Sequence, residues 1–430
     1  MTRLLITNGR VIDPSQNMDR MTNVLIEDGR IAAYDVPEGN EDSILNATNK
    51  IVAPGLIDIH VELREPGHEV DETIQSGTAA ALAGGFTSIA CIPDTDPPID
   101  TQAGVEFVKH QAALADNCNV FVLACASKNR EGKELAEIGS LVKAGAVGFT
   151  DADLPIHNTE LLRRALEYSQ MFDKPILNHP EVLDLTRKGV MHEGTVSMVL
   201  GLTGMPAEAE DVMTGRDLRL AEATGGRLHL MNISSSVSVE LIRRAKARCV
   251  RVTAEICPQN FTLTDIELRT FDSNCKVNPP IRSKDHVDDC IAGLVDGTID
   301  CITSGHSPRA CEKKMQPLDN APFGMINLET TLALVVTYLV EPGHLDWPTA
   351  LAKLTCNPAQ ILGLNKGTLQ IGADADVVII DPNECWTVQP NDFLSKSLNT
   401  PLGGQQLKGR AQQVLVDGDV KYSALVEANS

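Results

Sequence analysis

Three ionisable side chains stand at alternate positions in the stretch GLIDIHVELREPG, residues 55–67: His60, Glu62 and Arg64. Alternate side chains of a β-strand point to the same face, so a strand here would present all three together. Imidazole nitrogen and carboxylate oxygen both bind zinc, and a guanidinium group holds carboxylates through two parallel hydrogen bonds. The stretch alone leaves open whether it forms a metal site, an altered one, or what remains of one.

Other polar residues end further short apolar runs along the chain. In order, the runs are GLIDIH, FTSIACIP, NVFVLACA, AVGFTD, KPILNH, RLHLMNIS, VRVTAEICP and DCITSGH. Several of them end at a residue that could do chemistry, namely His60, Asp151, His179, Asn232 and His306. Between most runs lie segments with helical periodicity, such as ELLRRALEYSQMF and SVELIRRAKAR.

This alternation predicts the fold. Strands that alternate with helices form a parallel sheet, and eight repeats favour closure into an α/β fold of the (β/α)₈, TIM-like barrel type. In such barrels the carboxyl ends of the strands build the active site. A single histidine at a strand end is more often structural, but three of them with Asp151 favour a functional site. The remaining histidines are interpreted as surface or packing residues, with His229 as a buried strand residue: His68, His110, His157, His192, His229, His286 and His344.

The two ends of the chain resemble each other. RLLITNGRVID and NVLIEDGRIAAYDV surround NG and DG pairs, which are strong hairpin signals, and QQVLVDGDVKYS repeats the style near the other end. We therefore expect a small β-sandwich domain made from residues 1–50 and 365–430, with the barrel spanning 51–364.

Composition narrows the class of function. The formal charge of -21 argues against binding to nucleic acid or anionic membranes, which needs basic surfaces. No secretory signal, membrane span, phosphate-binding loop or nucleophile elbow is apparent. The eleven cysteines contain no C-x-x-C pair and are odd in number, which favours reduced thiols in a cytoplasmic protein.

A series of motifs in order along nearly the whole chain resembles the dihydroorotase branch of the amidohydrolase superfamily. The motifs are GLIDIHVELREPG, GGFTSIACIPDTDPPID, GAVGFTD, KVNPPIR, APFGMINLET, NPAQILGL, KGTLQIGADADVVIIDP and SKSLNTPLGGQQLKGR. The resemblance implies a (β/α)₈ barrel with a small β-domain from both termini. It also implies a zinc centre that interconverts carbamoyl-aspartate and dihydroorotate in pyrimidine biosynthesis.

The family's metal-ligand positions are only partly kept. By the resemblance, His60 and His179 match ligands, and Asp151 falls where a carboxylate is shared by two metals. Glu62 replaces a histidine, but its oxygens can still bind zinc. These four residues are the predicted metal ligands, with zinc absent or partial and a two-metal site disfavoured.

Two further positions have lost the family's residue. Asn232 stands where a ligand histidine is expected, and an amide oxygen is a poor zinc ligand. Gly305 replaces the catalytic aspartate, which removes a ligand and the proton carrier together. General acid–base assistance typically contributes about 10²–10⁴ in rate, so Gly305 is the most damaging change.

Some substrate-binding positions match the family and one does not. By the resemblance, Arg64 would clasp the substrate carboxylate, and Asn278 and His306 match substrate-contacting positions. Asp94 stands where the family usually has asparagine, and an anionic side chain there would repel a carboxylate-bearing substrate unless protonated or paired.

Three functions follow as hypotheses. The first is a non-catalytic homologue that serves as structural or regulatory partner of aspartate transcarbamoylase. The second is an active dihydroorotase with a rebuilt, mononuclear zinc site. The third, suggested by Asp94, is an amidohydrolase for another cyclic amide or a ligand-binding module. A homodimer or higher oligomer is expected from the resemblance alone.

Overall fold

The computed structural model describes residues 3–39 and 43–424. Eight strands follow one another around a near-closed parallel barrel in the order β15-β14-β13-β10-β9-β8-β7-β6. They are β6 (Leu56–Val61), β7 (Phe86–Cys91), β8 (Asn119–Cys125), β9 (Ala146–Thr150), β10 (Ile176–Asn178), β13 (Leu228–Leu230), β14 (Val252–Ile256) and β15 (Cys301–Ile302). Each coincides with one of the eight apolar runs, with β6 extending one residue beyond its run, so the predicted barrel is confirmed.

The barrel is closed by backbone contacts between its first and last strands. Val61 pairs in parallel with His306, and the Glu62 N–H donates to the His306 carbonyl at 2.9 Å. Because β15 is only two residues long, this bridge just beyond its end brings residues 60–64 next to residues 305–309. The two segments with the most altered chemistry are thus neighbours.

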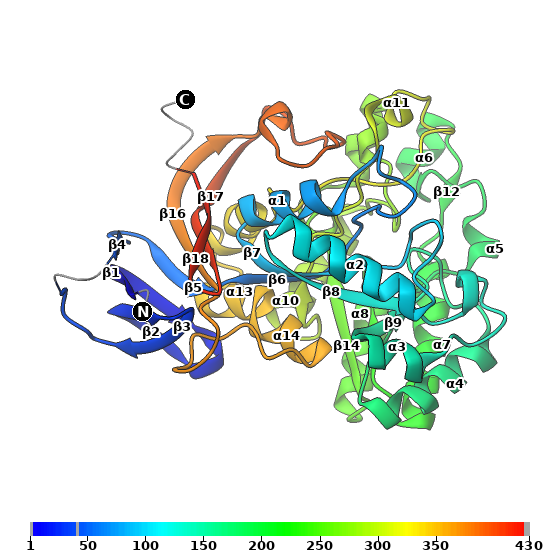
Figure 1. The fold of residues 1–430 in the computed structure, drawn as a ribbon. Coiled ribbons are helices and arrows are strands. Elements are labelled where there is room, and N and C mark those ends of the chain that lie inside the picture. Colours follow the sequence, from blue (N-terminus) through cyan, green and yellow to red (C-terminus); the bar gives the residue numbers. More distant parts are fainter. Residues whose placement is uncertain (1–2, 40–42, 425–430) are drawn as a thin grey trace.

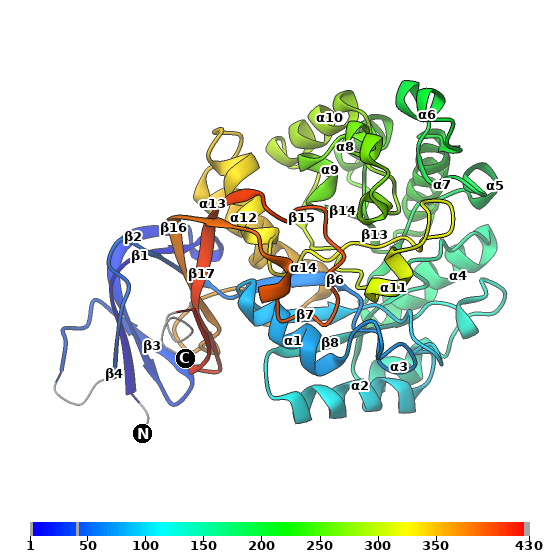
Figure 2. The same cartoon turned by 90° about the horizontal axis from the view of Figure 1, so that it is seen from above.

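Helices surround the barrel, as Figure 2 shows from above. The longer ones are α1 (Ile74–Ala83), α2 (Gln102–Ala115), α3 (Ile138–Ala144), α4 (Thr159–Ser169), α7 (Glu208–Thr224), α8 (Ser236–Ala247), α10 (Lys284–Val295), α13 (Trp347–Leu354) and α14 (Cys356–Leu362). Shorter elements in the loops are α5 (Leu183–Thr186), β11 (Met191–His192), α6 (Thr195–Leu200), β12 (Gly204–Met205), α9 (Gln259–Thr262), α11 (Cys311–Lys314) and α12 (Thr331–Val335). No helix among the described residues combines the length and apolar character that crossing a bilayer requires.

Helix α4 illustrates why these segments are helical. The Asn158 side chain accepts hydrogen bonds from the Glu160 and Leu161 N–H groups and so caps the first turn. Leu162 and Leu166, four residues apart, are fully buried against the barrel, while the opposite face carries exposed ion pairs.

A second sheet is built from both ends of the chain and lies beside the barrel (Figure 1). Its order is β18-β17-β16-β5-β1-β2-β3, and β4 pairs with β1. The strands are β1 (Arg3–Asp13), β2 (Met18–Glu27), β3 (Arg30–Tyr34), β4 (Ser43–Asn46), β5 (Ile51–Pro54), β16 (Val377–Thr387), β17 (Gln406–Val416) and β18 (Asp419–Ser423). The sheet formed by both termini is confirmed.

The hairpin signals at the two ends had different outcomes. The DG pairs at Asp28 and Asp417 do turn the chain, with positive φ at both residues of each pair, and connect antiparallel strands. The hairpin expected at Asn8 is wrong, because β1 continues through it with a register shift. Gly9 lies so close to the Val52 side chain that a β-carbon would collide with it, so glycine here serves a bulge and not a turn.

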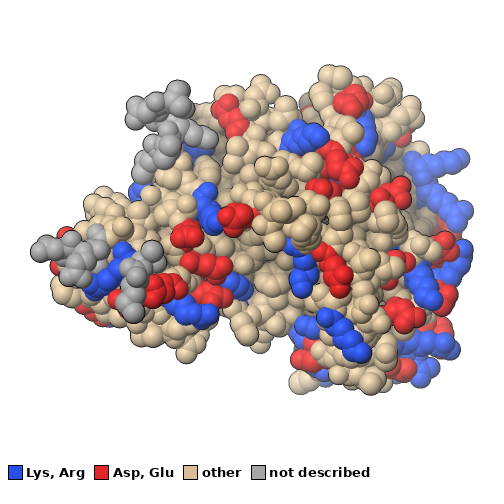
Figure 3. Space-filling view, in the orientation of Figure 1, with Lys and Arg blue, Asp and Glu red and all other residues tan. Residues whose placement is uncertain are grey.

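Charged side chains are spread over the surface. Figure 3 shows acidic and basic groups interspersed on one face, without a continuous basic surface. Acidic residues outnumber basic ones in the sequence, 58 to 37, and both kinds reach this face.

Candidate active site

Arg64 lies between two buried carboxylates at the end of β6. Its guanidinium forms ion pairs with both Glu62 and Asp94, and it also donates to the Ser307 hydroxyl at 3.2 Å. Ser307 in turn donates to Glu62 at 2.7 Å. The three charged side chains are each no more than 6% exposed. Burial raises the pKa of Asp94, although the charge of Arg64 opposes this effect.

This arrangement changes the role predicted for Arg64. Two of its guanidinium nitrogens already serve carboxylates of the protein itself, so the fork that would clasp a substrate carboxylate is occupied. The pairing also explains how Asp94 is accommodated without its usual asparagine, because Arg64 balances the negative charge of its carboxylate.

A cavity of about 300 Å³ opens beside this cluster. It is lined by Arg64, His68, Asp71, Asp94, Arg130, Asp153, Arg309, Lys313 and Pro322. Most of the charges are matched in pairs: Arg130 lies 3.0 Å from Asp153, and Lys313 lies 2.7 Å from Asp71. The acidic groups that line the cavity therefore have counter-ions from the protein itself.

His60 belongs to a chain of polar groups inside the barrel. Its Nδ1 lies 2.5 Å from one oxygen of Glu255, whose other oxygen lies 3.0 Å from His229 Nε2. His229 Nδ1 lies 2.8 Å from the Thr253 hydroxyl. Burial disfavours the charged form of Glu255, but the two histidines outweigh it and lower its pKa to about 2. Burial likewise opposes a charge on His60, yet Glu255 outweighs it and raises the pKa of His60.

Asp151 is directed toward the neighbouring strand. Its carboxylate accepts hydrogen bonds from the Ala126 N–H at 3.0 Å, the Ser127 N–H at 2.9 Å and the Ser127 hydroxyl at 2.5 Å. Burial raises the pKa of Asp151, and these donors oppose the rise. Both oxygens thus hold the loop after β8, which leaves metal ligation at Asp151 without support in the geometry.

His179 and Asn278 lie in one buried group with Glu181. The Asn278 amide donates to Glu181 at 2.8 Å, and His179 Nε2 lies 3.4 Å from the same carboxylate oxygen without forming a hydrogen bond. Burial opposes the charge on Glu181, but His179 outweighs it and lowers the pKa of Glu181 to about 2. Asn278 therefore binds a carboxylate of the protein, as Arg64 does.

The two positions that lost the family's residue meet at one side chain, Cys257. Its thiol donates to the side-chain amide oxygen, Oδ1, of Asn232 at 2.7 Å. A β-carbon on Gly305 would approach the same sulfur to under 3.0 Å, closer than such atoms tolerate, and Gly305 has a φ of +56°. The volume that an aspartate would need at position 305 is filled by Cys257.

His306 contributes its backbone to barrel closure and its side chain to the scaffold. The imidazole lies 3.5 Å from Glu72, and its Nδ1 is 3.5 Å from the Leu328 N–H. Glu72 also accepts from the Ser395 hydroxyl at 2.5 Å, so His306 links the barrel to the segment near residue 395.

The four predicted ligands do not gather around one point. Within the described ranges, three or more His, Cys, Asp or Glu donor atoms lie close enough to share an ion in one group, formed by His229, Glu255 and Cys301. His60, Glu62, Asp151 and His179 form no such group in this part of the chain. The reason is that each has a partner or neighbour of its own: Glu255, Arg64, the loop after β8, and Glu181, respectively.

Several residues of this region were missed from the sequence. They are Asp153, Arg130, Ser307, Arg309, Glu181, Glu255 and Cys257. The alternation of Thr253, Glu255 and Cys257 in the run VRVTAEICP was a usable signal, because alternate side chains of β14 and of the residue after it share one face. Asp153 follows two residues after Asp151 and could have been weighed against it.

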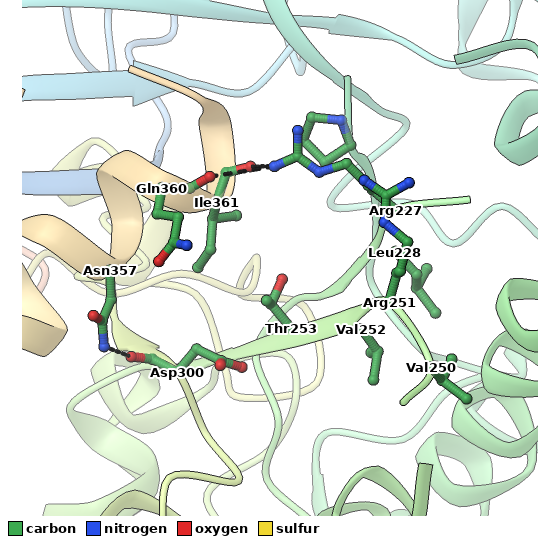
Figure 4. A pocket seen from close by; sticks show the side chains of 11 residues that line it. Arg227, Leu228, Val250, Arg251, Val252, Thr253, Asp300, Asn357, Gln360 and Ile361 are labelled. Atoms are coloured by element: carbon green, nitrogen blue, oxygen red, sulfur yellow. Dashed lines mark hydrogen bonds between the residues drawn. The ribbon is translucent and has the colours of Figure 1, made fainter. Parts of the chain in front are cut away.

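A second cavity, of about 430 Å³, lies at the opposite end of the barrel (Figure 4). Thr253 and Asp300 are among its lining residues, and Arg227 there donates to the backbone carbonyls of Gln360 and Ile361. It lies at the amino ends of β13 and β14, away from the strand ends where barrel active sites form.

Comparison with known proteins places the chain. A family model described as dihydro-orotase-like matches residues 49–238, and one described as amidohydrolase family matches residues 322–422. A dihydroorotase of Pelotomaculum thermopropionicum is 48% identical over 421 residues, covering 97% of this chain and 98% of that protein. This chain belongs to the dihydroorotase family. A dihydroorotase of Ruminiclostridium cellulolyticum, 46% identical over 97% of both chains, supports the same conclusion.

Solved structures of hydantoinases and dihydropyrimidinases resemble this dihydroorotase family member. The L-hydantoinase (dihydropyrimidinase) from Arthrobacter aurescens superposes with a TM-score of 0.88 at 25% identity, covering 98% of this chain and 96% of that one. The shared scaffold confirms the barrel-plus-sheet architecture.

The family's metal centre does not fit the residues found here. A dihydroorotase centre needs free donor groups converging at the strand ends, but Glu62 is paired with Arg64, and Asp151 is committed to the loop after β8. At Asn232 and Gly305 the space between the strands is closed by Cys257. The donor atoms that do converge lie deeper in the barrel.

Proposed function

We propose that this dihydroorotase family member is non-catalytic and acts in the cytoplasm as a structural or regulatory partner of aspartate transcarbamoylase in pyrimidine biosynthesis. The observation that carries the first half is Cys257, which fills the space between Asn232 and Gly305 where the family's ligand and proton carrier would stand. Without a carboxylate at position 305, a general acid–base contribution of about 10²–10⁴ in rate is lost.

Charge compensation supports the same proposal. In a metal centre, divalent ions neutralise the buried carboxylates. Here the guanidinium of Arg64 neutralises Glu62 and Asp94, so the cluster needs no ion to be stable. This chain keeps the family's fold, but an arginine supplies the positive charge that metal ions would supply. Such a chain can still bind a partner protein through its surface.

The catalytic half is tested by a hydrolysis assay. Purified protein is incubated with dihydroorotate and zinc, and ring opening is followed by absorbance, with Arg64→Met as the matched variant. We expect no turnover above buffer with either protein. Turnover by the natural chain that is lost on zinc chelation would overturn the proposal.

The partner half is tested separately. The full-length chain is mixed with the aspartate transcarbamoylase encoded in the same genome and passed over a size-exclusion column at physiological salt. Co-elution is the expected result. Separate elution at all salt concentrations would contradict the partnership while leaving the non-catalytic proposal standing.

A second candidate is an active dihydroorotase with a rebuilt, mononuclear zinc site. It is favoured by His179, which is 2% exposed and has no hydrogen-bond partner at either ring nitrogen, as a free metal ligand would. Zinc-dependent turnover that His179→Ala abolishes would select this candidate over the first.

A further inference from the structure

The interior of the barrel holds three donor side chains that no strand-end function uses. His229 on β13, Glu255 on β14 and Cys301 on β15 come from three adjacent strands, and their side chains meet below the level of the Arg64 cluster. One donor atom of each lies within 4.8 Å of the others, and all three residues are fully buried. Barrel interiors of this type are normally filled by branched apolar side chains, so the convergence of three donors is unusual.

We propose that His229, Glu255 and Cys301 bind one zinc ion inside the barrel, at a site separate from the strand-end centre of the family. The donor set is one imidazole nitrogen, one carboxylate oxygen and one thiolate sulfur, each of which is a normal zinc ligand. A thiolate selects zinc over the hard cations magnesium and calcium.

The spacing fits a tetrahedral ion after small movements. Zinc bonds of about 2.0–2.3 Å place tetrahedral donors roughly 3.3–3.8 Å apart. His229 Nε2 and Glu255 lie 3.0 Å apart, and no pair of the three donors exceeds 4.8 Å. Rotamer adjustments of under about 1 Å therefore suffice, and a solvent molecule completes the fourth position, as in other three-ligand zinc sites.

Neighbouring groups orient two of the ligands. In the ion-free structure His229 Nε2 donates to the Glu255 carboxylate; with the ion bound, Nδ1 would carry the proton and donate it to the Thr253 hydroxyl, 2.8 Å away, so that the Nε2 lone pair faces the ion. His60 Nδ1, 2.5 Å away, donates to the Glu255 oxygen that does not face His229. Such outer partners are characteristic of protein metal sites.

Charge balances within the barrel. On binding, the Cys301 thiol gives up its proton to solvent and becomes the thiolate, while Glu255 is already ionised and His229 stays neutral. One divalent ion with a thiolate and a carboxylate has zero net charge, which the apolar interior tolerates.

The second cavity is lined by neighbours of the three donors. Thr253, the hydrogen-bond partner of His229, lines the cavity at the barrel's amino end, and so does Asp300, the residue before Cys301 (Figure 4). The three donors themselves do not line the cavity and are fully buried.

Metal analysis and X-ray absorption spectroscopy of the natural chain test the proposal directly. Protein produced in zinc-supplemented medium and purified without chelators is analysed for metal after gel filtration. We expect about one zinc per chain, with one sulfur neighbour at about 2.3 Å and the remaining neighbours nitrogen or oxygen. Absence of zinc, or a zinc shell without sulfur, would overturn the proposal, and neither result depends on a variant that folds.

Variants then separate this site from the family's centre. Cys301→Ser is expected to lower zinc occupancy at least tenfold, whereas Cys290→Ser, at an equally buried cysteine on α10, keeps it. His179→Ala is also expected to keep it. The reverse pattern, with zinc lost in His179→Ala and kept in Cys301→Ser, would reject the interior site and point to the mononuclear candidate instead. The zinc analysis tests this inference, and the hydrolysis assay tests the proposed function. A chain that binds zinc through sulfur and does not hydrolyse dihydroorotate satisfies both, and either result can fail without the other.

Discussion

The Cys257 sulfur occupies the space that a β-carbon on Gly305 would require, and the same sulfur donates a hydrogen bond to Asn232. One side chain directly after β14 thus joins the two strand ends at which the chain departs from its family. The changes at 232 and 305 are therefore coupled through packing, and reversal of either alone leaves the cysteine in place.

Substitution of Gly305 by alanine should be strongly destabilising. Its φ of +56° strains any other residue, and the β-carbon collides with Cys257, so we expect a loss of about 2–4 kcal/mol in unfolding free energy. Gly297→Ala is the matched control, because Gly297 has a φ of +80° and nothing within 4 Å, and it should cost only about 1 kcal/mol. Urea unfolding of both variants measures the difference. Equal losses of unfolding free energy in the two variants would mean that the Cys257 side chain moves aside at little cost.

Removal of the Arg64 charge should expose the carboxylates it neutralises. Arg64→Met leaves Glu62 and Asp94 as buried anions, and breaking a buried pair typically costs about 3–5 kcal/mol. Adding Glu62→Gln and Asp94→Asn should recover much of the loss. Arg163→Met, at an exposed pair with Glu167, is the control and should change stability by under about 0.5 kcal/mol. An Arg64 variant as stable as the control would refute the neutralising role.

Asp151→Ala should affect folding and leave metal content unchanged. The variant deprives the Ala126 and Ser127 N–H groups and the Ser127 hydroxyl of their acceptor, at an expected cost of about 2–3 kcal/mol. Thermal unfolding and metal analysis on the same sample check both statements. Loss of bound zinc at unchanged stability would instead favour the ligand role predicted from the sequence.

Stability should depend on pH through Glu329. Burial raises the pKa of this carboxyl from 4.5 to about 7, while the N–H groups of Leu394 and Ser395 favour its charged form. The folded state therefore holds the proton more tightly than the unfolded state, so unfolding free energy falls as pH rises from 4.5 to about 7.

Glu329→Gln should remove that dependence. One amide oxygen can accept from both N–H groups, and the variant should gain about 1–2 kcal/mol above pH 7, a figure reduced because solvent reaches part of the side chain. Below pH 4.5 the two proteins should be equally stable. Glu106→Gln on α2 is an exposed control that should show no such pH-dependent gain. A constant difference across the pH range would contradict the assignment to Glu329.

The sequence by itself determined the eight strands, the terminal sheet and the family. These depend on local periodicity and ordered motifs, which a single chain displays directly. It also located Glu62, Asn232 and Gly305 as altered positions. The hairpin expected at Asn8 failed because Val52, distant in sequence, demanded a glycine inside a strand.

Tertiary structure alone decided which groups are partners. Residue types allowed Arg64 to meet a ligand and Asp151 to meet a metal, but in the fold Arg64 meets Glu62 and Asp94, and Asp151 meets Ser127. The sequence did not predict roles for Cys257, Glu255 and Cys301, because their contacts are made with side chains of neighbouring strands. The physical reason is that hydrogen bonds and ion pairs act over a few ångströms of space, and side chains on separate strands become neighbours only when the barrel closes.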